Sequence, residues 1–184
     1  MTRVFLSGSR RISRLNEAVR ERLRNMIENE LIVLIGDANG ADKAMQSFFR
    51  DQNYQNVKVY CSGGKCRNNI GGWPTEPVDV DASLKGRAFY TVKDKAMARA
   101  ADIGFVLWDG KSKGSLANAI ELLDAGKKVV LFHSADQAFY NFKEKSQLSG
   151  LLPPESKFDT VAQAGHRSSK LGTITASAQS SLPL

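Results

Sequence analysis

The 184-residue sequence is poor in the residues from which covalent frameworks and metal sites are built. It holds two cysteines, Cys61 and Cys66, and two histidines, His133 and His166, which lie far away along the chain. Two cysteines cannot form a disulfide framework, and four ligands of a structural zinc site do not occur together. We therefore predict two ordinary loop thiols rather than a zinc site, and neither a metal nor another cofactor.

Long hydrophobic runs are also missing. The longest apolar stretches include residues 31–35 and 129–132, which are far too short to span a bilayer. The first residues lack the apolar stretch of a signal peptide and lead directly into a strand-like segment. The sequence therefore predicts a cytoplasmic protein with no membrane partner.

Acidic residues are in deficit, with 19 Asp and Glu against 26 Lys and Arg, a net charge of +7. Such a surplus suits anionic partners such as nucleotides, phosphorylated sugars or nucleic acid. Nucleic acid is the less favoured of these, because no zinc finger, RNP motif or helix of interleaved arginines and aromatics occurs. The sequence leaves a homo-oligomer open.

Two common nucleotide-binding signatures are absent. There is no G-x-x-x-x-G-K-[ST] string and no G-x-G-x-x-G string, which argues against P-loop NTPases and dinucleotide dehydrogenases. Neither histidine lies in a nucleophile motif, so no Ser-His-Asp hydrolase is indicated.

Short apolar segments alternate with amphipathic ones along most of the chain. The apolar segments predict strands at 3–7, 31–35, 57–60, 103–107 and 128–132, and helical spacing predicts helices at 16–29, 41–51, 91–101 and 115–125. Strands that are apolar throughout and separated by helices are typical of a parallel sheet covered on both faces. We predict an α/β fold, a Rossmann-like open parallel sheet of about five strands with helices on both faces.

The predicted core domain covers residues 1–133. Residues 134–163 form a predicted C-terminal helical extension packed on it, with a helix at 137–145, and the Ser- and Ala-rich residues 164–184 predict a flexible tail. The glycine-rich segment 61–87 is either a lid over a ligand or a disordered insertion.

In open parallel sheets, ligands bind where strands end and helices begin. Three predicted strand ends carry glycine, serine and aspartate together, and their candidate binding residues are Gly8, Ser9, Arg10, Gly36, Asp37, Gly40, Asp42, Trp108, Asp109, Ser112, Gly114 and Ser115. Glycines allow backbone N–H groups to approach an anion, and a helix N-terminus adds its positive end. The three loops together predict a phosphate or nucleotide site.

Several of these residues also have a purely structural interpretation. The glycines suit tight turns, Asp42 suits a helix cap, and Trp108 suits the core as well as stacking on a base. Arg10 is a candidate for pairing with phosphate. Asp37 and Asp94 are the only catalytic candidates, although an acid in a first helical turn, as at Asp94, is stabilised there without any function.

Four segments together resemble the SLOG superfamily, Rossmann-like proteins related to the Lonely Guy phosphoribohydrolases and the DprA DNA-processing proteins. They are Gly8-Ser9-Arg10, Gly36-x-Ala38-x-Gly40-Ala41-Asp42, Lys93-Asp94-x-x-Met97-x-x-x-Ala101-Asp102 and Trp108-Asp109-Gly110-x-Ser112-x-Gly114-Ser115. The resemblance covers roughly residues 3–133. It implies a sheet whose loops hold a nucleoside phosphate or an ADP-ribose-like molecule, as in a sensor or a carrier.

The resemblance fails at one chemically important position. Lonely Guy enzymes carry P-G-G-x-G-T-x-x-E, and in the matching stretch Ser115 keeps the hydroxyl while Asn118 replaces the glutamate. An amide cannot act as a general acid or base, so we favour binding without catalysis, with Asn118 as a binding residue. Hydrolysis or transfer at the N-glycosidic bond of a nucleotide is the alternative, and single-stranded DNA binding is a more distant one.

Overall fold

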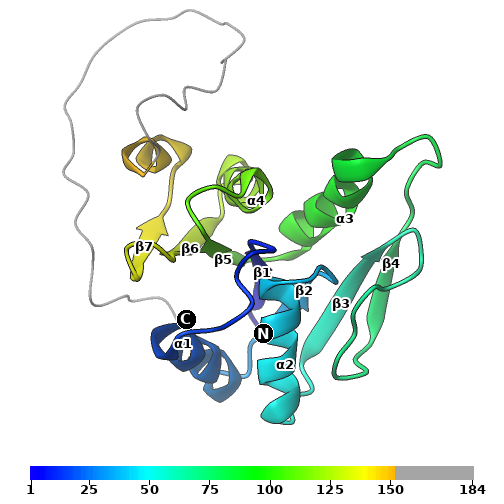
Figure 1. Ribbon diagram of the computed structural model, residues 1–184, viewed down its shortest axis with the longest axis horizontal. Coiled ribbons are helices and arrows are strands. Elements are labelled where there is room, and N and C mark those ends of the chain that lie inside the picture. Colours follow the sequence, from blue (N-terminus) through cyan, green and yellow to red (C-terminus); the bar gives the residue numbers. More distant parts are fainter. Residues whose placement is uncertain (152–184) are drawn as a thin grey trace, which may run out of the picture.

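The computed structural model describes residues 1–151, which form one twisted sheet with helices on both faces (Figure 1). The described elements are, in chain order, β1 (Arg3–Gly8), α1 (Glu17–Glu28), β2 (Ile32–Ile35), α2 (Ala41–Asp51), β3 (Val57–Ser62), β4 (Thr75–Val78), α3 (Gly86–Ala100), β5 (Ile103–Trp108), α4 (Lys113–Asp124), β6 (Lys128–His133), β7 (Ala138–Phe142) and the 3₁₀ helix η1 (Lys145–Gly150). The strand order is β4-β3-β2-β1-β5-β6-β7, and only the β6–β7 pair is antiparallel. The predicted α/β, Rossmann-like class is confirmed.

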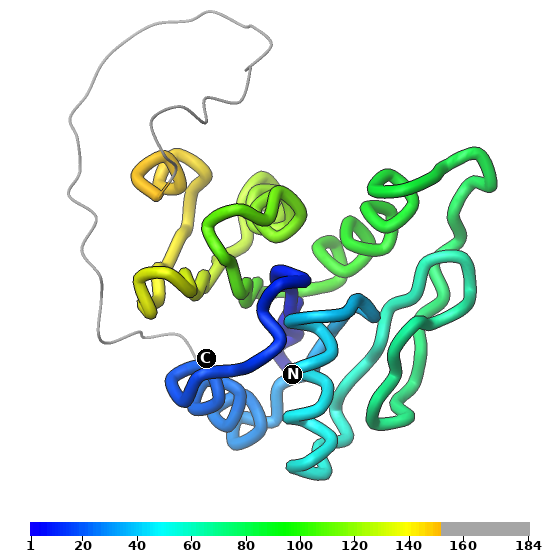
Figure 2. Tube along the Cα trace, in the orientation of Figure 1, coloured from blue at the N-terminus to red at the C-terminus, as the bar shows by residue number. Residues whose placement is uncertain are grey.

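The central strands are buried on both faces, as their continuous apolar runs predict. Along β1, Val4 and Leu6 face the cluster formed with α1 and α2, whereas Phe5 faces the cluster formed with α3 and α4. This alternation follows from the two-residue period of a strand. Figures 1 and 2 show the two helix pairs on opposite sides of the sheet.

The sheet has a switch point between β1 and β5. The chain adds β2, β3 and β4 on one side of β1, then returns through α3 to place β5 on its other side. At such a point the loops after neighbouring strands diverge to opposite faces and leave a crevice at the carboxyl edge. The topology therefore places this crevice at the carboxyl ends of β1 and β5.

Two strands differ from the sequence prediction. The predicted helix at 137–145 does not form: β7 pairs antiparallel with β6 through a turn in which Gln137 has φ 53°, and Lys145 begins η1. Phe139 packs in one core cluster and Tyr140 and Phe142 in the other, which is a strand period. The short edge strand β4 was not predicted either, because its sequence Thr-Glu-Pro-Val has no apolar run.

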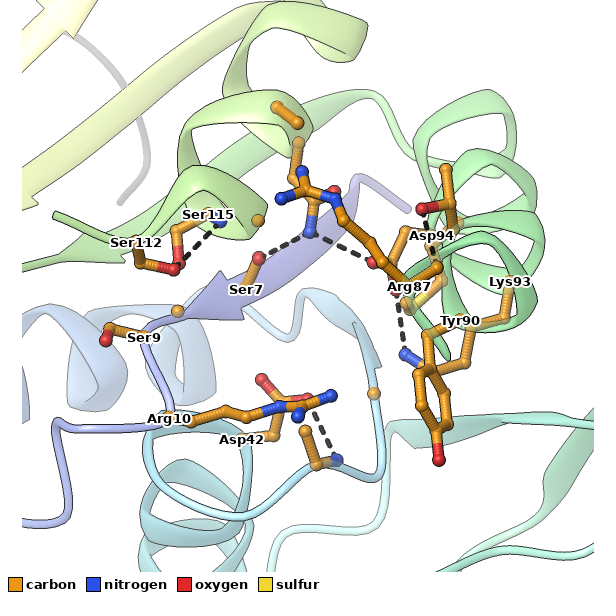
Figure 3. Close-up of a pocket in the computed structure, with 18 of the residues that line it drawn as sticks. Ser7, Ser9, Arg10, Asp42, Arg87, Tyr90, Lys93, Asp94, Ser112 and Ser115 are labelled. Carbon is orange, nitrogen blue, oxygen red and sulfur yellow. Dashed lines mark hydrogen bonds and ion pairs between the residues drawn. The ribbon is translucent and has the colours of Figure 1, made fainter. Parts of the chain in front are cut away.

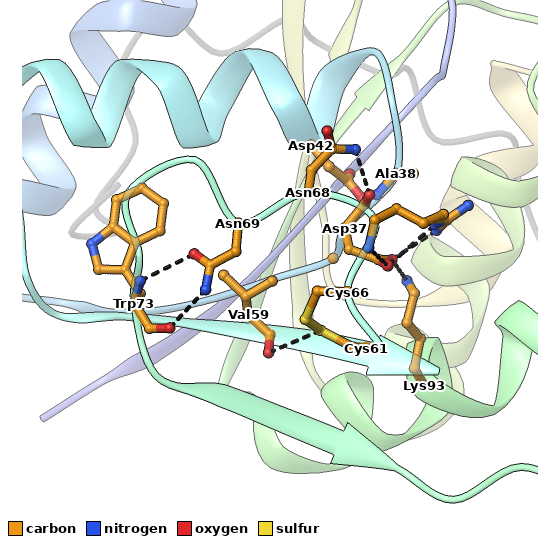
Figure 4. The surroundings of a disulfide bond; sticks show 12 residues. Asp37, Ala38, Asp42, Val59, Cys61, Cys66, Asn68, Asn69, Trp73 and Lys93 are labelled. Atoms are coloured by element: carbon orange, nitrogen blue, oxygen red, sulfur yellow. Dashed lines mark hydrogen bonds and ion pairs between the residues drawn. A yellow bond between two sulfur atoms is a disulfide. The ribbon is translucent and has the colours of Figure 1, made fainter. Parts of the chain in front are cut away.

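The prediction of two free thiols is wrong. Cys61 at the end of β3 and Cys66 form a disulfide, with their Cα atoms 4.9 Å apart (Figure 4). Gly63 and Gly64 both have positive φ and turn the chain back, so that the two sulfur atoms meet.

The predicted tail at 164–184 and residues 152–163 of the predicted extension lie outside the described residues. Among residues 1–151, no helix is both long enough and apolar enough to cross a bilayer.

Candidate functional site

A cleft of about 500 Å³ opens at the carboxyl ends of β1, β2 and β5, at the switch point (Figure 3). Its walls are the loops that follow these strands together with the inner sides of α3 and α4. Of the predicted binding residues, those lining it are Gly8, Ser9, Arg10, Gly36, Asp42, Asp109, Ser112, Gly114, Ser115 and Asn118. Asp94 also lines it, whereas Asp37, Gly40 and Trp108 do not.

The cleft is rich in positive charge. Its basic lining residues are Arg10, Arg11, Arg67, Arg87, Lys93, Lys95 and Lys111, and its acidic ones are Asp42, Asp94, Asp109 and Glu121. Lys93 is paired with Asp94, and Arg67 with the buried Asp37. The excess of positive charge therefore rests on the other basic lining residues, Arg10, Arg11, Arg87, Lys95 and Lys111. The cleft therefore suits an anionic ligand.

The loop after β1 is closely packed against its neighbours. A Cβ at Gly8 would lie 2.4 Å from the Cβ of Ala41, so glycine is needed for β1 to approach α2. The Ser9 hydroxyl donates to Asp109 Oδ2 at 2.8 Å and thereby ties this loop to the one after β5.

The space beside the loop after β2 is likewise occupied by other parts of the protein. Gly40 has φ +84°, and a Cβ there would lie 2.3 Å from the carbonyl oxygen of Arg10. Asp42 is buried and accepts a hydrogen bond from the Ala38 N–H at 3.2 Å. Its burial raises its pKa to about 6, and the nearby Lys93 ammonium offsets only part of that rise.

Asp37 lies beneath the cleft rather than in it. The Arg67 backbone N–H and Nε donate to Asp37 Oδ2 at 3.0 and 3.1 Å, and Arg67 Nη2 donates to Oδ1 at 2.7 Å. Burial would raise the pKa of Asp37, but these hydrogen bonds and the charge of Lys93 outweigh it, and the pKa is lowered. A buried carboxylate held ionised in this way is a poor general acid, so Asp37 is a structural anchor for Arg67.

The floor of the cleft is a chain of polar contacts between α3, α4 and β1. The buried Lys93 ammonium lies 2.8 Å from Asp94 Oδ1 and 3.9 Å from Asp37 Oδ1. Asn118 Nδ2 donates to Ser7 Oγ at 2.8 Å and approaches Asp94 Oδ2 at 3.5 Å. Asp94 is thus in the cleft, as a catalytic role requires, but it is paired with a cation there.

The loop after β5 leads into the N-terminus of α4. Asp109 accepts the N–H groups of Lys111 and Ser112, and Ser112 caps the helix by accepting from the Ser115 N–H. Burial opposes ionisation of Asp109, but these backbone bonds and the Ser9 hydroxyl outweigh it and lower its pKa. A Cβ at Gly114 would meet only Ser112 Oγ, at 3.9 Å. The space above Gly114 is therefore open.

Tyr90 on α3, which the sequence analysis did not single out, lies against two arginines of the cleft. The Arg67 and Arg10 guanidinium carbons lie 4.1 and 5.5 Å from the centre of the Tyr90 ring. Arg87 Nη2 donates to the Lys113 carbonyl at 2.9 Å and joins α3 to the start of α4. Arg67 and Arg87 both belong to the glycine-rich segment 61–87, and the fold brings both of them to the cleft.

Trp108 belongs to the core, not to the cleft. Its side chain is 2% exposed, its Nε1 donates to the Ser112 carbonyl at 3.1 Å, and its ring stacks on His133. Trp73 is likewise buried, with its Nε1 donating to the Tyr54 carbonyl. Within residues 1–151, no group of three or more His, Cys, Asp or Glu side chains could hold a metal ion.

Comparisons with known proteins give a fold and no family. The structure is similar to that of DNA processing protein A from Helicobacter pylori, whose description concerns its single-stranded DNA binding mode. The TM-score is 0.56 and the identity 14%, covering 83% of this chain and 74% of that chain. No family model matches the sequence, and no curated protein matches it. The structural similarity supports the Rossmann-like fold, and the function rests on the cleft.

Proposed function

We propose that the cleft binds a nucleotide or nucleotide-derived ligand, a nucleoside phosphate or an ADP-ribose-like molecule, as a sensor or carrier. The observation that carries the proposal is a basic cleft at the switch point, with a helix N-terminus and an open glycine at its wall. Parallel sheets bind nucleotides at this position in the fold. A volume of about 500 Å³ is within the usual range for small-molecule sites.

The phosphate is placed over Gly114 at the start of α4. The helix dipole and the N–H groups of the first turn favour an anion there, and the absence of a side chain lets an oxygen approach. Arg10, on the opposite wall, supplies a guanidinium that can pair with phosphate in a bidentate way.

The SLOG resemblance agrees with this placement. The residues that carry it come from four separate segments, and members of each segment line one cleft: Ser9, Asp42, Asp94 and Gly114. Binding without turnover is the favoured form, because Asn118 stands where the related hydrolases place a glutamate. Asn118 instead holds Ser7 and approaches Asp94.

Titration calorimetry with AMP, GMP, CMP and ADP-ribose, followed by chromatography of each mixture, tests the proposal. We expect at least one of these ligands to bind and to be recovered intact. No binding by any of the four would contradict the proposal, and release of free base or ribose phosphate at tens of turnovers per minute would favour the N-glycosidase alternative.

Single-stranded DNA is a second candidate, favoured by a specific feature of α3. Arg87, Thr91, Lys95 and Arg99 follow one another at four-residue intervals and line a shallow groove that continues from the cleft. Residues at this spacing lie on one face of a helix, so three positive charges form a row. The row suits a chain of phosphates, and the structural neighbour is described as binding single-stranded DNA.

The Arg99→Glu variant separates the two candidates, because Arg99 lines the groove but not the cleft. A mononucleotide held in the cleft should bind this variant as it binds the wild type. An extended strand should lose most of its affinity, and its binding to the wild type should fall steeply with salt.

A further inference from the structure

The Cys61–Cys66 disulfide lies directly before Arg67, the arginine that links the cleft to its buried anchor. Figure 4 shows the disulfide beside Asp37, Lys93 and Asn68. The backbone N–H of Arg67 and its guanidinium both hold Asp37, and the same guanidinium lies over the Tyr90 ring. The position of residue 66 therefore bears directly on where the positive charge of Arg67 sits in the cleft.

The turn at 63–65, which joins the two cysteines, is held by a hydrogen bond from the Gly63 N–H to the Val78 carbonyl at 3.0 Å. Gly63, Gly64 and Lys65 are exposed, and a Cβ at Gly64 would meet no atom within 4 Å. Two glycines give this turn much conformational freedom, which a covalent link between its ends removes. The disulfide thus adds a covalent restraint to a turn in which Gly64 has open space around it.

The surroundings of the two sulfur atoms suit reversible chemistry. Cys61 is buried at the end of β3, whereas Cys66 is partly exposed between Lys65 and Arg67. Positive neighbours and partial exposure are features of cysteines that exchange disulfides, because the thiolate is the nucleophile.

We propose that Cys61 and Cys66 form a redox-active pair whose oxidation tightens anion binding in the cleft by holding Arg67 against Asp37 and Tyr90. The effect on affinity rests on the proposed nucleotide site, whereas the effect on Arg67 does not. In the reduced protein the turn at 63–65 relaxes, and Arg67 leaves its anchor for part of the time.

The oxidant is a low-molecular-weight disulfide of the glutathione class. The Cys66 thiolate attacks one sulfur of that disulfide, forms a mixed disulfide and releases one thiolate. The Cys61 thiolate then attacks the Cys66 sulfur and releases the second. The protein loses two electrons and two protons, and the small disulfide becomes two thiols. A dithiol reverses both steps.

Trypsin cleavage after Arg67 tests the positioning without any ligand. The full chain is oxidised with glutathione disulfide or reduced with dithiothreitol, and cleavage at Arg67 and at the exposed Arg14 is followed by mass spectrometry. We expect cleavage at Arg67 to be at least tenfold faster in the reduced chain, with cleavage at Arg14 unchanged. Equal rates at Arg67, or cysteines that stay reduced in glutathione disulfide, would overturn the proposal.

Calorimetry with ADP-ribose then tests the effect on the cleft. We expect the oxidised chain to bind about five- to tenfold more tightly than the reduced chain, and Cys66→Ser to bind like the reduced chain with or without dithiothreitol. Equal affinity in both redox states would overturn the regulatory role. If none of AMP, GMP, CMP and ADP-ribose binds either form, the proposed function fails, and the trypsin result still decides whether the disulfide positions Arg67.

Discussion

The loops after β2 and β5 are built from similar residues, yet only one of them faces the cleft with free space. Both follow a buried strand, and both combine glycine with aspartate before a helix. In the β2 loop, Gly40 is pressed against the Arg10 backbone and Asp37 is bonded to Arg67. In the β5 loop, Gly114 faces open space. Similar composition thus serves packing in one loop and leaves room for a ligand in the other.

The largest expected difference between the loops is in stability. Gly40→Ala forces a side chain at φ +84° into the Arg10 backbone, and such strain costs about 3 kcal/mol or more. For a chain of this size that lowers Tm by roughly 6–12 °C. The matched Gly114→Ala should shift Tm by less than about 2 °C, since it adds a methyl group to open space at a helix start. If calorimetry found the same fall in Tm for Gly40→Ala and Gly114→Ala, the two loops would not differ in packing as described.

Arg10 should contribute directly to affinity. Arg10→Ala removes a charged hydrogen bond to phosphate and should weaken ADP-ribose binding by about 1.5–3 kcal/mol. Arg10→Lys should recover only part, because an ammonium cannot form the bidentate pair. The exposed Arg14 lies outside the cleft lining, so Arg14→Ala serves as the control. If calorimetry found the same ADP-ribose affinity for Arg10→Ala and Arg14→Ala, Arg10 would not contact the ligand.

The buried Asp42 predicts a pH-dependent stability in the β2 loop. Its pKa rises from 3.8 to about 6 on folding, so the folded chain keeps a proton that the unfolded chain has lost. Its contribution favours folding at low pH and is lost as pH rises from 3.8 to 6. Asp42→Asn should match the wild type at pH 4 and be more stable by about 1–2 kcal/mol at pH 7, because the amide carries no charge that burial would penalise.

Denaturant unfolding of the wild type and Asp42→Asn between pH 4 and 7.5 measures this difference. A stability gap that stays constant across the range would contradict the burial of an ionisable Asp42.

The smallest expected effect is a gain of slow chemistry at α4. Asn118→Glu places a carboxyl near Asp94, since the amide nitrogen lies 3.5 Å from Asp94 Oδ2. Two neighbouring carboxylates raise the pKa of one, which makes it a better general acid. We expect slow release of base from AMP, seen by chromatography over hours, with none from the wild type. The Asn118→Gln variant is the control and should be inactive.

The fold could be predicted from the sequence because its strands are buried on both faces and therefore read as continuous apolar runs. The 103–107 and 128–132 segments became β5 and β6, each one residue longer. The predictions failed where a strand lies at an edge. Residues 75–78 include a proline, and residues 138–142 are aromatic with no clear period, so pairing with a neighbouring strand decided both.

The sequence predicted which loops form the cleft, but not the role of each residue in them. The strand ends indicated which loops meet, but the roles of Asp37 and Trp108 depend on contacts with residues 30 positions away or on core packing. Tyr90 could not be predicted as a cleft residue, because only the fold brings its ring against Arg67. The disulfide escaped notice because two cysteines alone carry no framework.

The central claim is that a ligand phosphate lies over Gly114, and calorimetry of Gly114→Val with ADP-ribose tests it most directly. The valine side chain fills the open space at the N-terminus of α4, where a Cβ would otherwise meet only Ser112 Oγ. We expect the variant to melt within about 2 °C of the wild type, because β-branched residues are tolerated at least as well as glycine in a helix. We also expect ADP-ribose binding to be lost. Undiminished affinity in a folded Gly114→Val protein would contradict this claim.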